Sequence, residues 1–312
     1  MQSRLKLSAA PLIHTYSIVA RDPTSGEMGV AVQSHYFATG AVVTWAEAGV
    51  GAVATQAFAD PSYGKLGLDL MRAGRPAPDA LAGLLAADAM REIRQVAMID
   101  AHGRVAAHTG RTTIPAAGHI VGAGFSVQAN MMLRDTVWPA MAAAFESSRG
   151  ELADRMIAAL DAAEREGGDI RGKQSAAILV VGGKGGGQPW NDKIHDVRVD
   201  DAAQPLAELR RMLGISRASH HIKAAETAAE VGDFETMNRE FELAEPMMGD
   251  NPEMRFWRAV TTIAAGRHDE GLAMLREVGA RDRNWIELAL RLPREVFPID
   301  DMKGRIRELL PK

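Results

Sequence analysis

Alternating polar and apolar side chains mark the first strand that the sequence predicts. Between His14 and Asp22, the hydroxyl residues Thr15 and Ser17 alternate with bulkier or apolar neighbours, a period of two that is typical of a strand with one packed face. Later apolar runs are rich in Val and small residues and are bounded by turn residues. They predict strands at 28–34, 50–56, 94–100, 105–109, 125–130, 174–181 and 194–200.

Apolar residues at the spacing of a helix predict helices at 66–73, 77–87, 135–146 and 151–165. These helices come in pairs between groups of strands, and the strands within a group are close enough in sequence to form hairpins. A chain with one helix after each strand would indicate a doubly wound parallel sheet. The observed order instead predicts an α+β fold in which paired helices pack on antiparallel sheets.

From about Pro205 onward the strand-type composition gives way to Leu, Ala, Glu, Arg and Met, which favour helices. Gly232 recurs as Gly266, and their separation of 34 residues (266 − 232) is the period of a tetratricopeptide repeat. Because one repeat cannot bury its own apolar face, we expect residues 206–213 and 286–292 to cap the stack. We expect the stack to bind a peptide or another subunit, or to dock on the first domain, with Trp257 and Trp285 in its core.

Length and composition favour two domains in an ordinary globular chain. Its 312 residues carry a formal net charge of −4, which provides no field for binding nucleic acid or anionic lipid. We divide the chain into a tail at 1–12, an α+β domain at 13–201 and a helical domain at 202–312. No apolar run is long enough for a membrane span or a secretory signal, which predicts a cytoplasmic protein without a membrane partner.

Polar residues gather where several predicted strands end, and hydrogen-bonding groups on a rigid sheet can form a binding site. These residues are Gln33, Ser34, His35, Thr55, Gln56, Gln128 and Asn130. The alternative is that the strands end in polar residues simply because they leave the core. With no cysteine in the chain, covalent catalysis would have to use Ser, Thr, Lys or a carboxylate.

Two other patterns support neither a phosphate site nor a metal site. The glycine run at 182–187 is followed by Gln-Pro-Trp, whereas a phosphate-binding loop needs Ser or Thr after its Gly-Lys. We interpret the run as a hairpin turn. His220 and His221 are adjacent, so they point apart on a helix and do not form a metal-binding pair.

Four separated motifs, at 17–22, 29–34, 48–57 and 171–176, occur in the same order in a bacterial family. Together they resemble domain-of-unknown-function family 1028, and the resemblance covers about Ile13 to Asp201. That family has the fold of the N-terminal-nucleophile hydrolases. The resemblance therefore implies a four-layer αββα sandwich, followed here by the helical extension seen in some members.

In that hydrolase superfamily the nucleophile is the first residue of the mature first strand, and its own α-amine is the general base. The resemblance implies Thr15 as the nucleophile, with Ser34 or His35 supporting it. Fourteen residues precede Thr15, so its nitrogen lies in a peptide bond. The standard mechanism therefore requires a cut after His14.

Two hypotheses follow, and neither needs a cofactor. In the first, the chain hydrolyses an amide or related C–N bond of a small polar substrate, with Thr15 freed by cleavage or activated by His35 as base. In the second, it is a non-catalytic binding or scaffold protein that holds a small ligand. Its helical repeat then contacts a protein partner or a second copy of the chain. The residues expected to contact the small molecule are Ser17, Gln33, Thr55, Gln56, Gln128 and Asn130.

Overall fold

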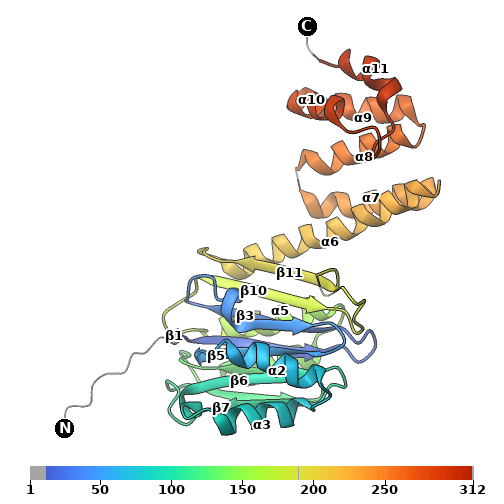
Figure 1. The fold of residues 1–312 in the computed structure, drawn as a ribbon. Coiled ribbons are helices and arrows are strands. Elements are labelled where there is room, and N and C mark those ends of the chain that lie inside the picture. Colours follow the sequence, from blue (N-terminus) through green and yellow to red (C-terminus); the bar gives the residue numbers. More distant parts are fainter. Residues whose placement is uncertain (1–11, 189, 250, 311–312) are drawn as a thin grey trace. The chain divides into compact units, whose positions relative to one another are not determined.

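The computed structural model describes residues 12–188, 190–249 and 251–310. The chain divides into two compact units, one ending at Arg210 and the other beginning at Arg211. Figure 1 shows that the first unit combines strands and helices, whereas the second is helical. The α+β class expected from the sequence is confirmed. The predicted tail at 1–12 lies outside the described residues, except for Leu12.

A six-stranded sheet contains the first long strand. Its strands are β2 (Thr15–Arg21), β3 (Met28–Ser34), β8 (Gly118–Gly122), β9 (Phe125–Ala129), β10 (Ser175–Val181) and β11 (Lys193–Val199). They lie in the order β11-β10-β3-β2-β9-β8, and all neighbours are antiparallel. Gly26 has a φ of +78° in the turn from β2 to β3, a conformation that disfavours any side chain.

A five-stranded sheet packs against the first. It contains β1 (Leu12–Ile13), β4 (Thr44–Glu47), β5 (Gly51–Phe58), β6 (Arg94–Asp100) and β7 (Val105–Thr109). One edge of β5 pairs with β6, which in turn pairs with β7. The other edge of β5 pairs with β4 near its start and with β1 at its end. A short helix, α1 (Gly40–Val43), precedes β4.

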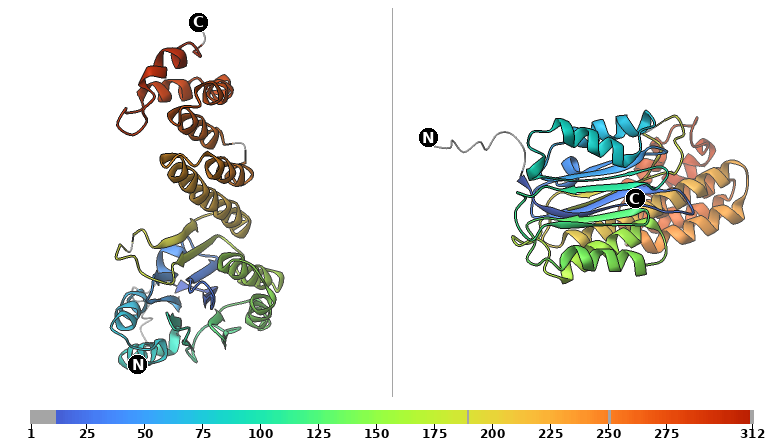
Figure 2. Two further views of the ribbon diagram at one scale, coloured as in Figure 1. Left: turned by 90° about the vertical axis from the view of Figure 1, so that its right-hand side faces the viewer. Right: turned by 90° about the horizontal axis from the view of Figure 1, so that it is seen from below.

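Two helices cover the outer face of each sheet. α2 (Ser62–Arg72) and α3 (Ala77–Ala87) contact the five-stranded sheet, and α4 (Val137–Ser147) and α5 (Leu152–Arg165) contact the six-stranded sheet. The right-hand view of Figure 2 shows the two sheets between these helical layers. Val19, Val30, Ala54, Ala97 and Ile99 belong to the core between the sheets, where side chains from the two inner faces interdigitate.

The chain changes sheet at His14. Ile13 pairs with Ala57 in the five-stranded sheet, whereas Thr15 pairs with Ser34 in the six-stranded sheet. The peptide bond between His14 and Thr15 therefore lies where the chain crosses from one sheet to the other. The sequence predicts a single strand here, because the two residues of β1 are too few to show an alternation.

The second unit is a series of helices. They are α6 (Pro205–Glu230), within which the boundary between the units falls, α7 (Phe234–Met248), α8 (Pro252–Ala264), α9 (His268–Arg281), α10 (Asn284–Arg291) and α11 (Lys303–Arg307). One buried cluster centres on Phe256, with Trp257 and Trp285 packed against it from partly buried positions.

The 34-residue period found in the sequence is a period of the structure. Gly232 and Gly266 end α6 and α8 with φ values of +77° and +82°. The N–H of the residue after each glycine donates to the carbonyl five residues back, at 2.9 Å after Gly232 and 3.1 Å after Gly266. This is the hydrogen bond of a glycine-ended helix. Phe241 and Leu275, also 34 residues apart, are both fully buried.

Several predicted elements match the structure closely, and others begin elsewhere. The helix predicted at 66–73 begins at Ser62, whose N–H donates to Asp60 Oδ1 at 2.9 Å. Its first turn lacks an apolar period, so the pattern begins late. The sequence predicts none of α1, β4 and β8. None of the described helices combines the length and the hydropathy that crossing a membrane requires.

Candidate functional site

Strand alternation brings polar side chains together between the two sheets, at the end where β2 begins. Thr15 and Ser17 share a strand face with Val19, which packs between the sheets. The same rule places Gln56 on the face of Ala54. We call this group the inter-sheet polar cluster. Its fully buried members are Thr15, Ser17, Ser34, Gln56, Gln95, Ser126, Gln128 and Asn130.

Amide side chains in this cluster are bonded to one another. Gln95 Oε1 accepts from Gln56 Nε2 at 2.6 Å and from Asn130 Nδ2 at 2.9 Å. Gln56 Oε1 accepts from Ser17 Oγ at 2.6 Å, and Ser17 Oγ accepts from Gln128 Nε2 at 2.6 Å. A buried polar network whose members satisfy each other is rigid. It therefore fixes the backbone that these side chains touch.

That backbone includes the carbonyl of Thr15. Its oxygen accepts from the Asn130 N–H at 3.1 Å and from Gln56 Nε2 at 3.2 Å. Thr15 Oγ1 donates to the Ile13 carbonyl oxygen at 3.1 Å. The hydroxyl of Thr15 is therefore turned back over the two residues that precede it, towards the point where the chain changes sheet.

Two donors hold the carbonyl oxygen of His14. Ser34 Oγ lies 2.6 Å from it and Arg171 Nη2 lies 2.9 Å from it. Asp169 positions the guanidinium, because its carboxylate accepts from Arg171 Nε at 3.0 Å and from Nη2 at 2.7 Å. A hydroxyl and a guanidinium aimed at one carbonyl oxygen polarise it. They would stabilise the negative charge that develops there if the carbonyl carbon were attacked.

The side chain of His14 is also buried, with 2% of its surface exposed. Its Nδ1 lies 2.7 Å from Asn130 Oδ1, and because that oxygen only accepts, Nδ1 carries the proton. Burial lowers the pKa of His14, the hydrogen bond to Asn130 opposes this effect, and the positive charge of Arg171 adds to it. The imidazole is therefore held in its neutral form more firmly than a free histidine.

Strained backbone follows two residues of the cluster. Ala57 comes after Gln56 with a φ of +68°, and Met131 comes after Asn130 with a φ of +61°. A left-handed conformation costs a residue with a side chain about 1 to 2 kcal/mol. Strain of this kind persists where the surrounding contacts offset it, and it is frequent at functional sites.

A second polar group lies on the opposite face of the six-stranded sheet. Glu164 Oε1 of α5 accepts from Tyr16 Oη and from Gln33 Nε2, each at 2.6 Å, and Lys173 Nζ lies 3.3 Å from Oε2. Burial and the neighbouring Glu164 raise the pKa of Tyr16 far above its usual value. Gln33, expected to contact substrate, is therefore separated from Thr15 by the sheet itself.

Thr55 and His35 are also not brought to Thr15. Thr55 Oγ1 donates to the Asp60 carbonyl at 3.1 Å, and it shares the face of Val53, which packs in the cluster of α2 and α3. His35 is exposed, and it is its backbone N–H, not its ring, that donates to Asp169 at 3.2 Å. The predicted residues that do lie together are Thr15, Ser17, Ser34, Gln56, Gln128 and Asn130.

Several residues of the site were not predicted, among them Gln95, Arg171 and Asp169. Gln95 is the single amide among the core-facing positions of β6, beside Ala97 and Ile99, and that unusual position was the available signal. Arg171 and Asp169 lie in the loop before β10, 157 residues from His14 in the case of Arg171. No local pattern could pair them with it.

The donors and acceptors of the site are hydroxyls, amides and a guanidinium, which suit carbonyl chemistry. Within the residues that the structure describes, no three His, Asp or Glu side chains are grouped as they would be around a metal ion.

Comparisons with known proteins found a family and a crystal structure that resemble the first unit. Residues 15–209 match the family of unknown function DUF1028. Protein SPO2555 from Silicibacter pomeroyi, whose crystal structure is assigned to the same family, is 30% identical with a TM-score of 0.58. The similarity covers 64% of this chain and 88% of that one. No curated protein matches the chain. The match over most of the first unit shows that the chain belongs to the DUF1028 family.

Proposed function

We propose that the first unit is an amide hydrolase of the N-terminal-nucleophile type, with Thr15 as its nucleophile once the peptide bond after His14 has been cut. The observation that carries this proposal is the pair of donors, Ser34 Oγ and Arg171 Nη2, on the carbonyl oxygen of His14. The order of a helical pair, two sheets and a second helical pair supports the four-layer αββα assignment.

The cut follows from groups already in place. Thr15 Oγ1 attacks the carbonyl carbon of His14, the C–N bond breaks, and the hydroxyl proton passes to the Thr15 nitrogen, which gives an ester. Ser34 and Arg171 stabilise the oxyanion that forms on the way. Water then hydrolyses the ester. The products are a carboxylate on His14 and a Thr15 with a free hydroxyl and a free α-amine.

The same groups then serve a substrate. The α-amine of Thr15 takes the hydroxyl proton as general base, and the hydroxyl attacks the carbonyl carbon of a small polar amide. Ser34 and Arg171, released from the His14 carbonyl, hold the substrate carbonyl oxygen instead. The amides of Gln56 and Asn130 position Thr15 by holding its own carbonyl.

The intact mass of the full chain tests the cut. We expect purified protein to lose the mass of residues 1–14, and Thr15→Ala to keep it under the same conditions. Arg171→Ala should slow the cut by about 10² to 10³, as the loss of one oxyanion donor does. Arg155→Ala, which removes an arginine bonded to Asp22 in the same unit, should cut at the normal rate. Active protein with an unchanged mass would contradict the proposal.

Hydrolysis is measured separately, with a series of acyl anilides as probes and release of the aniline as the signal. Thr15→Ser should retain activity, and Thr15→Ala should lose it. The Thr15→Ala variant must also remain folded by circular dichroism. Hydrolysis that survives in Thr15→Ala would assign the chemistry to another residue.

A binding or scaffold protein is the second candidate, because the amides of the inter-sheet polar cluster already bond to one another. In that case the helical unit, whose repeated 34-residue geometry resembles a tetratricopeptide stack, supplies the contact with a peptide or a second copy. This candidate predicts that Thr15→Ala leaves ligand affinity unchanged. A complete loss of binding would count against it.

A further inference from the structure

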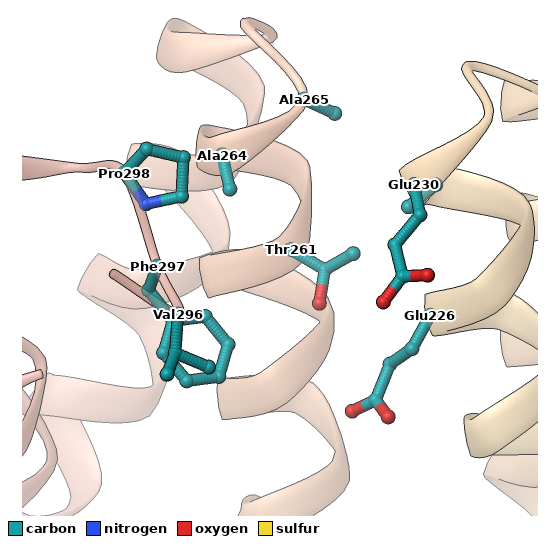
Figure 3. A pocket seen from close by; sticks show the side chains of 9 residues that line it. Glu226, Glu230, Thr261, Ala264, Ala265, Val296, Phe297 and Pro298 are labelled. Atoms are coloured by element: carbon teal, nitrogen blue, oxygen red, sulfur yellow. The ribbon is translucent and has the colours of Figure 1, made fainter. Parts of the chain in front are cut away.

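The helical unit contains a pocket of about 370 Å³ between α6 and α8, which Figure 3 shows from close by. Glu226 and Glu230 line it from α6, and Thr261 lines it from α8. Both carboxylates are directed across the pocket towards α8. Phe297 and its neighbours form an apolar wall, in which Val296 is 64% exposed.

The two carboxylates have no ion-pair partner within salt-bridge distance among the described residues, whereas Glu240, Glu270 and Asp269 of the same unit each have one. They are four residues apart on one helix, where like charges repel. Burial and the charge of Glu230 raise the pKa of Glu226, and Lys223 opposes this effect only in part. The pocket therefore carries negative charge that Lys223 offsets only in part.

A third acceptor completes the pocket. Thr261 is 7% exposed, and its hydroxyl forms no hydrogen bond with any residue that the structure describes. The adjacent Thr262 behaves differently, because its Oγ1 donates to the Arg258 carbonyl at 2.7 Å. Thr261 lines the acidic pocket, and its hydroxyl, which has no partner among the described residues, is free to bond to a ligand there.

We propose that this pocket binds a primary alkylammonium group, with the charged nitrogen among Glu226, Glu230 and Thr261 and the alkyl stem along Phe297. An ammonium group has three donors and no acceptor, which matches two carboxylates and one hydroxyl. A guanidinium is planar and binds best to one carboxylate through two parallel bonds. The apolar wall suits a methylene stem of the kind that lysine carries.

Titrations of the full chain, followed by the methyl signals of Val296 and Thr261 in nuclear magnetic resonance spectra, test this proposal. The probes are n-butylammonium, its neutral counterpart n-butanol, and the Nα-acetyl N-methylamides of lysine and arginine. We expect n-butylammonium to bind at least tenfold more tightly than n-butanol, and the lysine derivative more tightly than the arginine derivative. If the lysine derivative binds more tightly than n-butylammonium, the natural ligand is a lysine side chain of a peptide. If n-butylammonium binds more tightly, the natural ligand is a free amine.

Variants assign the binding to the pocket. The double variant E226Q/E230Q should lose at least tenfold in affinity, and Thr261→Val, which keeps the shape but removes the hydroxyl, should lose about threefold to tenfold. Glu235→Gln, an exposed carboxylate on α7 that does not line the pocket, should bind as the unchanged chain does. The proposal is overturned if n-butanol binds equally well, if the arginine derivative binds more tightly, or if E226Q/E230Q keeps its affinity.

Discussion

Two groups of polar side chains, one in each unit, differ in whether they have partners within the protein. In the inter-sheet polar cluster, Gln56, Gln95 and Asn130 are fully buried and bond to each other and to backbone carbonyls. In the acidic pocket of the helical unit, Glu226 and Glu230 have no ion-pair partner among the described residues.

The difference follows from burial. A polar group removed from water must find partners inside the protein, because leaving it unpaired costs several kcal/mol. A carboxylate at the edge of a pocket keeps part of its hydration and can stay unpaired. Closed networks therefore position backbone, as Gln56 does for Thr15, and partly hydrated groups remain available to a ligand.

The largest expected effect comes from opening the closed network. Gln95→Leu keeps the volume but leaves Gln56 Nε2 and Asn130 Nδ2 without the acceptor that they share. We expect the free energy of unfolding to fall by about 3 to 5 kcal/mol, measured by urea denaturation. Gln204→Leu, an exposed glutamine in the same unit, should change it by less than about 0.5 kcal/mol. Similar values for both variants would remove the distinction.

A smaller effect concerns pH and the buried His14. Burial sets its folded pKa below the usual 6.5, so the unfolded chain binds more protons as the pH falls through 6.5. Stability is then full above 6.5 and is lost as the pH falls towards the folded pKa. The test uses the Thr15→Ala variant, in which His14 is expected to stay attached. In that variant, His14→Gln should reduce the loss in the free energy of unfolding by up to about 1.4 kcal/mol per pH unit.

Urea denaturation at pH 7.5 and pH 5.5 measures that difference. His119→Asn is the matched comparison, because burial and the nearby His108 also lower the pKa of His119. It should remove a similar part of the slope. A His14→Gln variant that keeps the whole pH dependence would show that His14 is not held neutral by its surroundings.

The smallest effect is expected in the pocket, and it has the opposite sign. Glu226→Gln removes a like-charge pair spaced four residues apart, so stability should rise by about 0.2 to 0.5 kcal/mol. Added salt should shrink the gain, because it screens the repulsion between exposed charges. A loss of stability at low salt would mean that Glu226 is already paired.

Sequence patterns predicted elements well where one period runs uninterrupted. The strands at 28–34, 94–100 and 105–109 and the helix at 77–87 have the predicted bounds. β1 and β4 were missed because they have two and four residues, too few for a period to show. Their formation depends on pairing with β5, which is a tertiary contact.

The candidate site was predictable only as far as alternation reaches. Thr15 and Ser17 lie on one face of β2 because they are two residues apart. Thr55 and Gln56 are adjacent in β5, so their side chains lie on opposite faces of that strand. The prediction grouped consecutive residues and so placed Thr55 and Gln33 with the wrong neighbours. Arg171 reaches the His14 carbonyl from a distant loop, a contact that depends on the assembled sheets.

The crossing of the chain between the two sheets has a further consequence for access. Leu12 and Ile13 satisfy the backbone of Phe58 and Ala57 at the end of β5. In the proposed function, the cut after His14 and the departure of the segment would leave free N–H and C=O groups at that edge beside Thr15, and we expect the amides of the edge then to exchange with deuterium. Free edges accept extended chains. The edge of β5 would thus become a binding site for an extended substrate backbone. The acyl carbonyl of the substrate would then lie where the His14 carbonyl had been.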